Sequence, residues 1–328
     1  MDLIRKNGYG LFTAFCIAVV AIFLGSRFRL IGSAVFAILL GILYNNLKGV
    51  SKREKAGLKF SGKKLLQYSI IALGFTMSFA KVTETGTQSL AITLVTIAIS
   101  FSVALLVGKK LSLSGKLSTL IGFGTAICGG SAIAAASPVV EADEEEIALS
   151  ISTIFLFNIV AVFLFPFLGR WMGMDDTMFG IWAGTAINDT SSVVAAGYSY
   201  SEEAGNIATI VKLTRALMIV PSCILMAMIR VYKDRAKSNV SIVKIMPWFI
   251  LWFLVASLIS SSGLIPSEWA KYAKTISQWL MAMALAGIGS QVSFAQFKKA
   301  GLKPIATGAT AWFAVAVSSL IMQKILFG

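Results

Sequence analysis

The sequence predicts an all-α polytopic membrane protein with about eleven transmembrane helices. Hydrophobic residues make up 57% of its 328 residues, and the mean hydropathy is +0.81. Only 13% of the residues are charged, against about 25% in an ordinary soluble domain. Apolar segments close to 20 residues long, the length that crosses a bilayer, recur along the chain. A soluble protein cannot cover this much apolar surface, and a disordered one lacks it, so both classes are excluded.

Eleven apolar segments are expected as membrane helices, with ten as the lower bound. The segments are residues 9–24, 30–44, 65–80, 89–107, 117–136, 147–168, 177–196, 206–230, 245–262, 273–294 and 304–326. The longest connection, residues 45–64, is rich in Lys and is expected to form a basic amphipathic helix at the membrane surface.

The charges predict the orientation of the chain in the membrane. Lys and Arg outnumber Asp and Glu by 29 to 15, which gives a net charge of +14. Twenty-one of the cations fall on one side of the predicted spans, six on the other and two inside a span. Because Lys and Arg collect in cytoplasmic loops, we expect a multi-pass membrane protein with a cytoplasmic N-terminus and an external C-terminus. The surplus charge therefore indicates orientation and a lipid surface, and no nucleic-acid partner is expected.

The order of the segments suggests an inverted repeat. Residues 1–29 would form an extra N-terminal helix, followed by five-helix halves at 30–168 and 177–326. Inverted five-helix repeats with broken, crossing helices are typical of secondary transporters. The tetrapeptide GTAI occurs at 124–127 and again at 184–187. A second echo links residues 74–86 with 289–301, but the two echoes do not occupy corresponding places in one duplication.

The first polar segment inside a predicted span reads GTAICGGSAIAAASPVV. The pair Gly129-Gly130, after Cys128 and before Ser131, predicts a helix break near 128–131, because glycine tolerates non-helical backbone. The freed N–H groups at the start of the following half-helix would accept an anion. The alternative is a close helix–helix interface, since small residues let backbones approach in lipid.

The second polar segment, residues 184–192, holds Asp189, the only carboxylate inside a predicted span. An intramembrane carboxylate is costly and indicates a function or a buried pair. Two cations in the next span, Lys212 and Arg215, are three residues apart and share a helix face. They are the expected partners of Asp189, and they leave a local surplus of one positive charge. Weaker candidates are Gly287, Gly289 and Gln291, which suggest a second break near 287–291.

These motifs, together with KLTR before a proline, resemble the YeiH family of bacterial inner-membrane proteins, described as sulfate exporters. The resemblance spans about residues 10–326. That family is similar to the cation:proton antiporter and bile acid:sodium symporter superfamily, which implies a core and a scaffold domain, a homodimer and an elevator mechanism. The implied site residues are Thr125, Cys128, Gly129, Gly130, Ser131, Thr185, Asn188, Asp189, Thr190, Ser191, Lys212 and Arg215. Many family members have His where Asn188 stands, so a His-based proton relay is not expected here.

Three functions remain open from the sequence. The leading hypothesis is a secondary transporter for a small anion of the sulfate, sulfonate or carboxylate class. In it Lys212 and Arg215 bind the substrate, and Asn188 and Asp189 take a coupling Na⁺ or H⁺. The alternative is a monovalent cation:proton antiporter that uses Asn188 and Asp189. A membrane enzyme is a minor alternative. The chain has no His and three Cys without metal-type spacing, so no catalytic residues, metal or cofactor are expected.

Overall fold

The computed structural model describes residues 2–28, 32–234, 246–263, 266–293 and 301–327, and all regular structure in these ranges is helical. Five of the described helices are long and apolar enough to cross a membrane: Asn7–Arg27, Phe79–Lys110, Glu144–Trp171, Glu202–Ile229 and Leu302–Phe327. Three shorter apolar helices are Gly32–Leu47, Gly130–Val140 and Trp248–Ser261. The all-helical class is confirmed. Eleven spans and the inverted repeat stay predictions, and part of the basic loop at 230–244 lies outside the described residues.

The chain divides into two compact units that do not follow its halves. Unit 1 comprises Met1–Thr85, Val194–Glu202 and Trp248–Phe294, and unit 2 comprises Gly86–Val193, Glu203–Pro247 and Ala295–Gly328. The predicted boundaries at 29, 168 and 177 separate the halves of an inverted repeat, whereas these units are defined by their compactness. The boundaries therefore also stay predictions.

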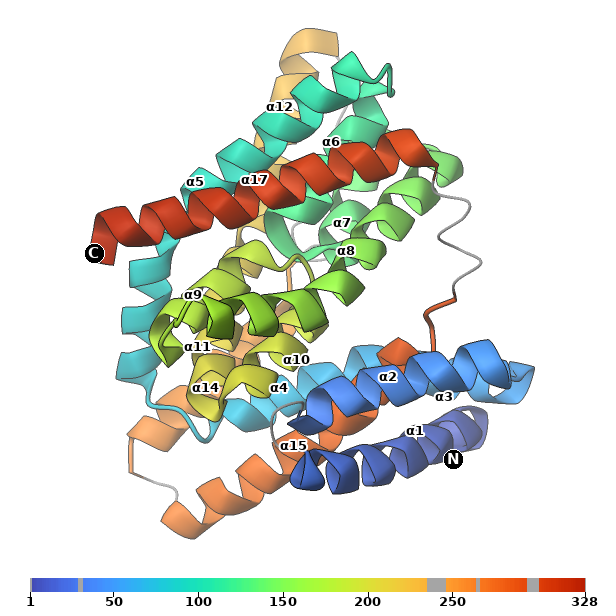
Figure 1. Ribbon diagram of the computed structural model, residues 1–328, viewed down its shortest axis with the longest axis vertical. Helices are drawn as coiled ribbons and strands as arrows, with labels where there is room; N and C mark the ends of the chain where they lie inside the picture. The colour runs from blue at the N-terminus through green and yellow to red at the C-terminus, as the bar shows by residue number, and fades with distance from the viewer. Residues whose placement is uncertain (1, 29–31, 235–245, 264–265, 294–300, 328) are drawn as a thin grey trace. The chain divides into compact units, whose positions relative to one another are not determined.

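Unit 1 contains α1 (Asp2–Arg27), α2 (Gly32–Leu47), α3 (Lys52–Phe60), η1 (Ser61–Leu65), α4 (Leu66–Gly74), α14 (Trp248–Ser261) and α15 (Ser267–Gly289). Helix α1 packs against α2 and α3, and α15 packs against α2 and α4 (Figure 1). The backbones of α1 and α3 approach closely where Gly10 faces Gly57, and a side chain on either glycine would meet main-chain atoms of the other helix. Small residues permit this kind of approach in membrane proteins.

The surface helix predicted within residues 45–64 is confirmed as a helix, but the helical structure continues beyond the last basic residue of this stretch. Ser51 and Glu54 form a capping box at the start of α3, in which each satisfies a free N–H of the first turn. The chain then continues through the π-helical segment η1 into α4 without a loop. The basic stretch and the next apolar segment are therefore one continuous rod.

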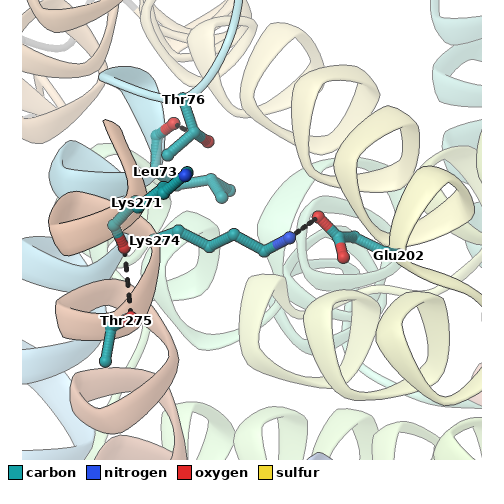
Figure 2. Close-up of polar contacts among 6 residues, drawn as sticks. All are labelled: Leu73, Thr76, Glu202, Lys271, Lys274 and Thr275. Atoms are coloured by element: carbon teal, nitrogen blue, oxygen red, sulfur yellow. Dashed lines mark hydrogen bonds and ion pairs between the residues drawn. The ribbon is translucent and has the colours of Figure 1, made fainter. Parts of the chain in front are cut away.

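Residues 194–202 are joined to α15 by an ion pair within unit 1. Figure 2 shows the Lys274 ammonium pointing at Glu202, with 2.6 Å between Nζ and Oε1. In the same helix, the side-chain hydroxyl of Thr275 donates a hydrogen bond to the main-chain carbonyl of Lys271, one turn earlier. Both charged side chains are about half exposed, so the pair contributes at most about 1 kcal/mol.

Unit 2 contains α6 (Gly115–Phe123), η2 (Gly124–Cys128), α7 (Gly130–Val140), α8 (Glu144–Trp171), α9 (Asp176–Ala186), most of α11 (Glu202–Leu217), α12 (Ile219–Asp234) and α17 (Leu302–Phe327). Helices α5 (Phe79–Lys110) and α10 (Thr190–Tyr200) contribute residues to both units. The chain departs from helical geometry at Met218, between α11 and α12 and three residues before Pro221, because a proline ring clashes with the carbonyl four residues earlier.

An aromatic cluster holds α9 against its neighbours in unit 2. The ring of Phe165 from α8 stacks on Trp182 from α9, with 4.3 Å between centroids, and lies 5.7 Å from Trp312 of α17. The indole N–H of Trp182 donates to the carbonyl of Ala316. Because Phe165 and Trp182 are buried and the three rings pack at favourable separations, the C-terminal end of α9 is firmly positioned. That end carries the second polar segment.

Candidate functional site

Unit 2 contains two interrupted helices, and the first interruption is at Gly129. The π-helical segment η2 ends at Cys128, and Gly129 has φ 66° and ψ −130° before α7 begins at Gly130. Only glycine adopts such a conformation without strain. The predicted site residues Thr125, Cys128 and Gly129 lie at this break, where Gly129 donates to the carbonyl of Gly124 over 2.9 Å. The Gly-Gly pair therefore ends one half-helix and starts another.

The second interruption follows α9. That helix ends at Ala186, Ile187 is extended with φ −83° and ψ 134°, and α10 begins at Thr190. Three residues, Ile187, Asn188 and Asp189, lie between the two half-helices. A side chain built on Gly129 would lie 3.5 Å from the Cβ atom of Asp189. The two interruptions are therefore neighbours in space.

Two fully buried cations of α11 bind the carbonyl ends of both interruptions. The Lys212 ammonium donates to the carbonyl oxygens of Ile127 and Ile187, over 2.7 Å and 2.9 Å. Lys212 and Arg215 are both 0% exposed. One hydrogen bond thus reaches the end of η2 and the other reaches the residue that follows α9.

The Arg215 guanidinium makes the same connection with more donors. Its Nε donates to the carbonyl of Ala126 over 2.5 Å, Nη2 donates to that of Thr125, and Nη1 donates to that of Thr185. A longer contact of 3.4 Å joins Nη1 to the Ile187 carbonyl. The last carbonyls of a helix have no partner within the helix and carry partial negative charge. Both cations thus stabilise two half-helix C-termini at once.

The carboxylate of Asp189 is engaged differently from the sequence hypothesis. Its Oδ2 accepts hydrogen bonds from the backbone N–H, at 3.0 Å, and the hydroxyl of Ser191. This is the geometry of an N-cap, and it satisfies a free donor at the start of α10. In the described part of the chain, no hydrogen bond or ion pair joins this carboxylate to Lys212 or Arg215. Lys212 and Arg215, the partners expected for Asp189, instead bind free main-chain carbonyls.

The N-terminus of α7 has no such cap. Gly129 precedes it and offers no side-chain acceptor. Ser131 is exposed, and Gly130 and Thr190 are partly exposed. The first N–H groups of a helix lack partners within the helix and attract negative charge. Of the two half-helix starts, α10 therefore carries its own carboxylate, and α7 is open to an external anion.

Several polar groups near the interruptions are buried without a protein partner. Both side-chain atoms of Asn188 and the hydroxyl of Thr125 have no hydrogen bond among the described residues, and both residues are 0% exposed. Buried polar atoms are normally satisfied by protein, water or an ion. These groups are therefore candidates to contact a bound ion or solute.

Two residues outside the predicted site support it. Asn158 of α8 accepts the backbone N–H of Asp189 over 3.2 Å, and Ser319 of α17 lies 2.5 Å from the Thr185 hydroxyl. Asn158 is recognisable in the sequence as a lone polar residue in an apolar helix. Ser319 carries no comparable signal, because serine bonds its own helix backbone readily.

The weak candidates belong to unit 1 and not to the unit with the interruptions. Gly287 and Gly289 lie at the end of α15, where added side chains would meet the backbones of α3 and α2. Gln291 is exposed and donates to the carbonyl of Gly287 over 2.9 Å. Helix α15 simply ends at Gly289. These glycines permit close helix packing within unit 1.

Comparisons with known proteins identify the family but not the activity. The family model described as "Conserved hypothetical protein 698" matches residues 9–308. A UPF0324 membrane protein of Clostridium tetani (strain Massachusetts / E88) is 41% identical over 99% of both chains. UPF0324 membrane protein FN0533 of Fusobacterium nucleatum is 37% identical over 97% of this chain and 98% of its own. The family resemblance predicted from the motifs is confirmed, as is the assignment to a multi-pass membrane protein.

One solved structure is similar over the full length of both chains. It is the sodium proton antiporter MjNhaP1 from Methanocaldococcus jannaschii at pH 8, with 14% sequence identity and a TM-score of 0.31. A score this low does not establish a shared fold.

Proposed function

Because the chain belongs to the family described as conserved hypothetical protein 698, whose relatives are membrane proteins, we propose that it is a secondary transporter for a small anion. The substrate class is sulfate, a sulfonate or a carboxylate, carried across the bacterial inner membrane by alternating access. The resemblance to the YeiH family adds an elevator mechanism and a homodimer to this proposal. Catalysis, a metal and a cofactor form no part of it.

The observation that carries the proposal is the charge at the paired interruptions. Lys212 and Arg215 contribute two positive charges, and their described partners are neutral carbonyls. Asp189 contributes one negative charge. The half-helix starts of α7 and α10 each add a partial positive charge of about one half, and the half-helix ends of η2 and α9 each add a partial negative charge of the same size, so the four helix ends cancel and the net charge is about +1. The sum is positive in a medium that screens poorly, and it favours an anion over a cation.

The anion is proposed to bind first at the open N-terminus of α7. Its oxygens would accept from the backbone N–H groups of Gly130 and Ser131, which is a common mode of sulfate and carboxylate binding. Lys212 has three N–H donors and uses two on carbonyls. Lys212 and Arg215 would thus act mainly by shaping the break and supplying positive potential, and less as direct ligands.

Asp189 supplies a route to ion coupling. When it binds H⁺ or Na⁺, the local formal charge rises from +1 to +2, and anion affinity rises with it. By reciprocity, a bound anion then raises the affinity for the coupling ion by the same factor. The sign of this linkage predicts that anion and cation bind together and move in the same direction.

Ligand-dependent stability of the purified protein tests the proposal. Sulfate, an alkylsulfonate, a dicarboxylate, NaCl and LiCl are added separately, because a ligand of the folded state raises the unfolding temperature. We expect at least one divalent anion to stabilise the wild type and Lys212→Met to lose that response. Lys116→Met is the matched control, since Lys116 is exposed and also donates to a main-chain carbonyl. An anion response that survives in Lys212→Met contradicts the charge argument.

A conservative variant tests the coupling role separately. Asp189→Asn keeps an N-cap acceptor, since Asn caps helices as well as Asp, but removes the charge. We expect anion stabilisation to persist and to lose its dependence on pH or Na⁺. The matched control is Asp175→Asn, which changes the exposed N-cap of α9. Wild-type ion dependence in Asp189→Asn would rule out the coupling role.

The buried, partnerless amide of Asn188 favours one alternative, a monovalent cation:proton antiporter. Its Oδ1 could coordinate Na⁺ beside the Asp189 carboxylate. In that case Na⁺ or Li⁺ alone stabilises the protein, Asn188→Ala abolishes the effect, and sulfate does nothing. The same ligand panel therefore separates the two functions.

A further inference from the structure

Unit 1 carries a long open groove that has no part in the proposed transport site. Its volume is about 1190 Å³. One wall is formed by α1 through Phe12, Cys16 and Val20, and the other by α2 through Leu40, Leu43 and Leu47. The groove ends at the connection to α3, where Lys48 and Arg53 line it. It is therefore apolar along its length and basic at one end.

The length of the groove fits one leaflet of a bilayer. Its lining on α1 runs from Tyr9 to Val20, which is about 16 Å at a rise of 1.5 Å per residue. The hydrocarbon core of a bilayer is about 30 Å thick, so a single leaflet spans about half of that. Phe12 is 69% exposed and Leu47 is 83% exposed. The groove is thus open along its side to the acyl chains of surrounding lipid.

The basic end keeps a net positive charge despite a nearby carboxylate. Glu54 accepts hydrogen bonds from the Tyr44 hydroxyl, from Thr13 Oγ1 over 2.9 Å and from the Ser51 N–H over 3.0 Å. These contacts join α1, α2 and α3 and use the acceptors of the carboxylate. Lys48 and Arg53 are exposed, and the Lys48 ammonium lies 5.2 Å from the centre of the Tyr44 ring.

We propose that this groove binds an anionic phospholipid, with one acyl chain along α1 and α2 and the phosphate between Lys48 and Arg53. The apolar walls match the chain, and the two cations match a headgroup with net negative charge. A soluble anion would leave the apolar walls unused, and a zwitterionic lipid would leave the cations less well compensated. The predicted orientation places this end on the cytoplasmic side, where basic residues meet anionic lipid.

Cys16 offers a direct probe of occupancy. It lines the groove and is exposed, whereas Cys128 and Cys223 are buried. The rate of maleimide labelling at Cys16 is measured for full-length protein in phosphatidylcholine nanodiscs, with and without phosphatidylglycerol. At a lipid concentration about ten times its dissociation constant, phosphatidylglycerol should slow labelling about tenfold. Cys16→Ser gives the background rate.

Charge reversal identifies the headgroup contact. The double variant Lys48→Glu, Arg53→Glu should lose the protection. The double variant Lys109→Glu, Lys110→Glu makes the same charge change at an exposed pair on the last turn of α5 and should keep it. If that first variant fails to fold, native mass spectrometry of the wild type replaces it, and selective retention of phosphatidylglycerol over phosphatidylcholine supports the proposal.

Four results would overturn the proposal. Equal protection by both lipids indicates a general lipid annulus. Protection by glycerol phosphate alone indicates a site for a free phosphate. Disulfide-linked dimers through Cys16 indicate that a second copy of the chain fills the groove. Unchanged protection after charge reversal at Lys48 and Arg53 removes the headgroup contact.

Discussion

The substitution Gly129→Ala tests whether the first interruption depends on backbone conformation. At φ 66° and ψ −130°, a residue with a side chain is held in a sparsely populated region, at a cost of about 1–3 kcal/mol. The added methyl group has room, because its nearest neighbours would be Asp189 Cβ and Ile154 Cγ2, both 3.5 Å away. Conformational strain alone should therefore lower the ratio of folded to unfolded protein by about fivefold or more.

The neighbouring glycine provides a matched control. Gly130 lies inside α7, and a side chain there would meet nothing within 4 Å. Alanine at such a helical position restricts the unfolded chain and should stabilise the protein by about 0.4–1 kcal/mol. Two adjacent glycines thus receive the same methyl group with effects of opposite sign.

Unfolding in mixed micelles, followed by tryptophan fluorescence, measures both variants against the wild type. We expect Gly129→Ala to unfold at a lower fraction of denaturing detergent and Gly130→Ala at an equal or higher one. Anion-dependent stability, where present, should fall with Gly129→Ala, because the break presents the α7 N-terminus. Equal stability of the two variants would refute the strained break.

Three further predictions use the same unfolding assay. Arg215→Met leaves three or more buried carbonyls without a donor and should cost at least about 3 kcal/mol; a loss below 1 kcal/mol would show that these contacts are not made. Burial raises the pKa of Glu54, but the hydrogen bonds it accepts lower that pKa to about 2. Its contribution is then present above the unfolded value of 4.5 and disappears as the pH falls through about 2. Glu54→Gln should flatten the stability profile in that window, and an unchanged profile counts against the contacts. Lys274→Ala breaks the exposed pair with Glu202 and should cost less than about 1 kcal/mol, falling with salt; a larger, salt-independent loss would show a buried pair.

The sequence predicts the helical class and the place of the first interruption well. Apolar length identifies membrane helices, and adjacent glycines mark the backbone that can leave the helix. The second interruption is harder to foresee, because Ile187 and Asn188 are compatible with an ordinary helix. The continuous helix from α3 through α4 is also not apparent from the sequence. The composition changes there from basic to apolar, which suggests a boundary between elements, although no residue at that point ends a helix.

The partners of the buried charges were the least accessible feature. Counting formal charges pairs Lys212 and Arg215 with Asp189, whereas both cations bind main-chain carbonyls and Asp189 caps α10. Unwinding a helix creates these acceptors, and side-chain types alone do not show them. The same limit applies to Gly287 and Gly289, because the residue type alone does not show whether a glycine permits close helix packing or interrupts a helix.

The π-helical segment η2 has a consequence for comparing relatives of this chain. Each residue turns the direction of the side chains around the helix axis by about 100°. An extra residue in one wide turn therefore rotates the helical residues before that turn relative to those after it. Deleting one residue between 124 and 128 would restore regular winding and carry the carbonyls of Thr125 and Ala126 away from Arg215. A related sequence with a single-residue gap there would therefore lack the hydrogen bonds from Arg215 to the carbonyls of Thr125 and Ala126. A gap of the same size in the turn at 141–143 would leave these hydrogen bonds intact.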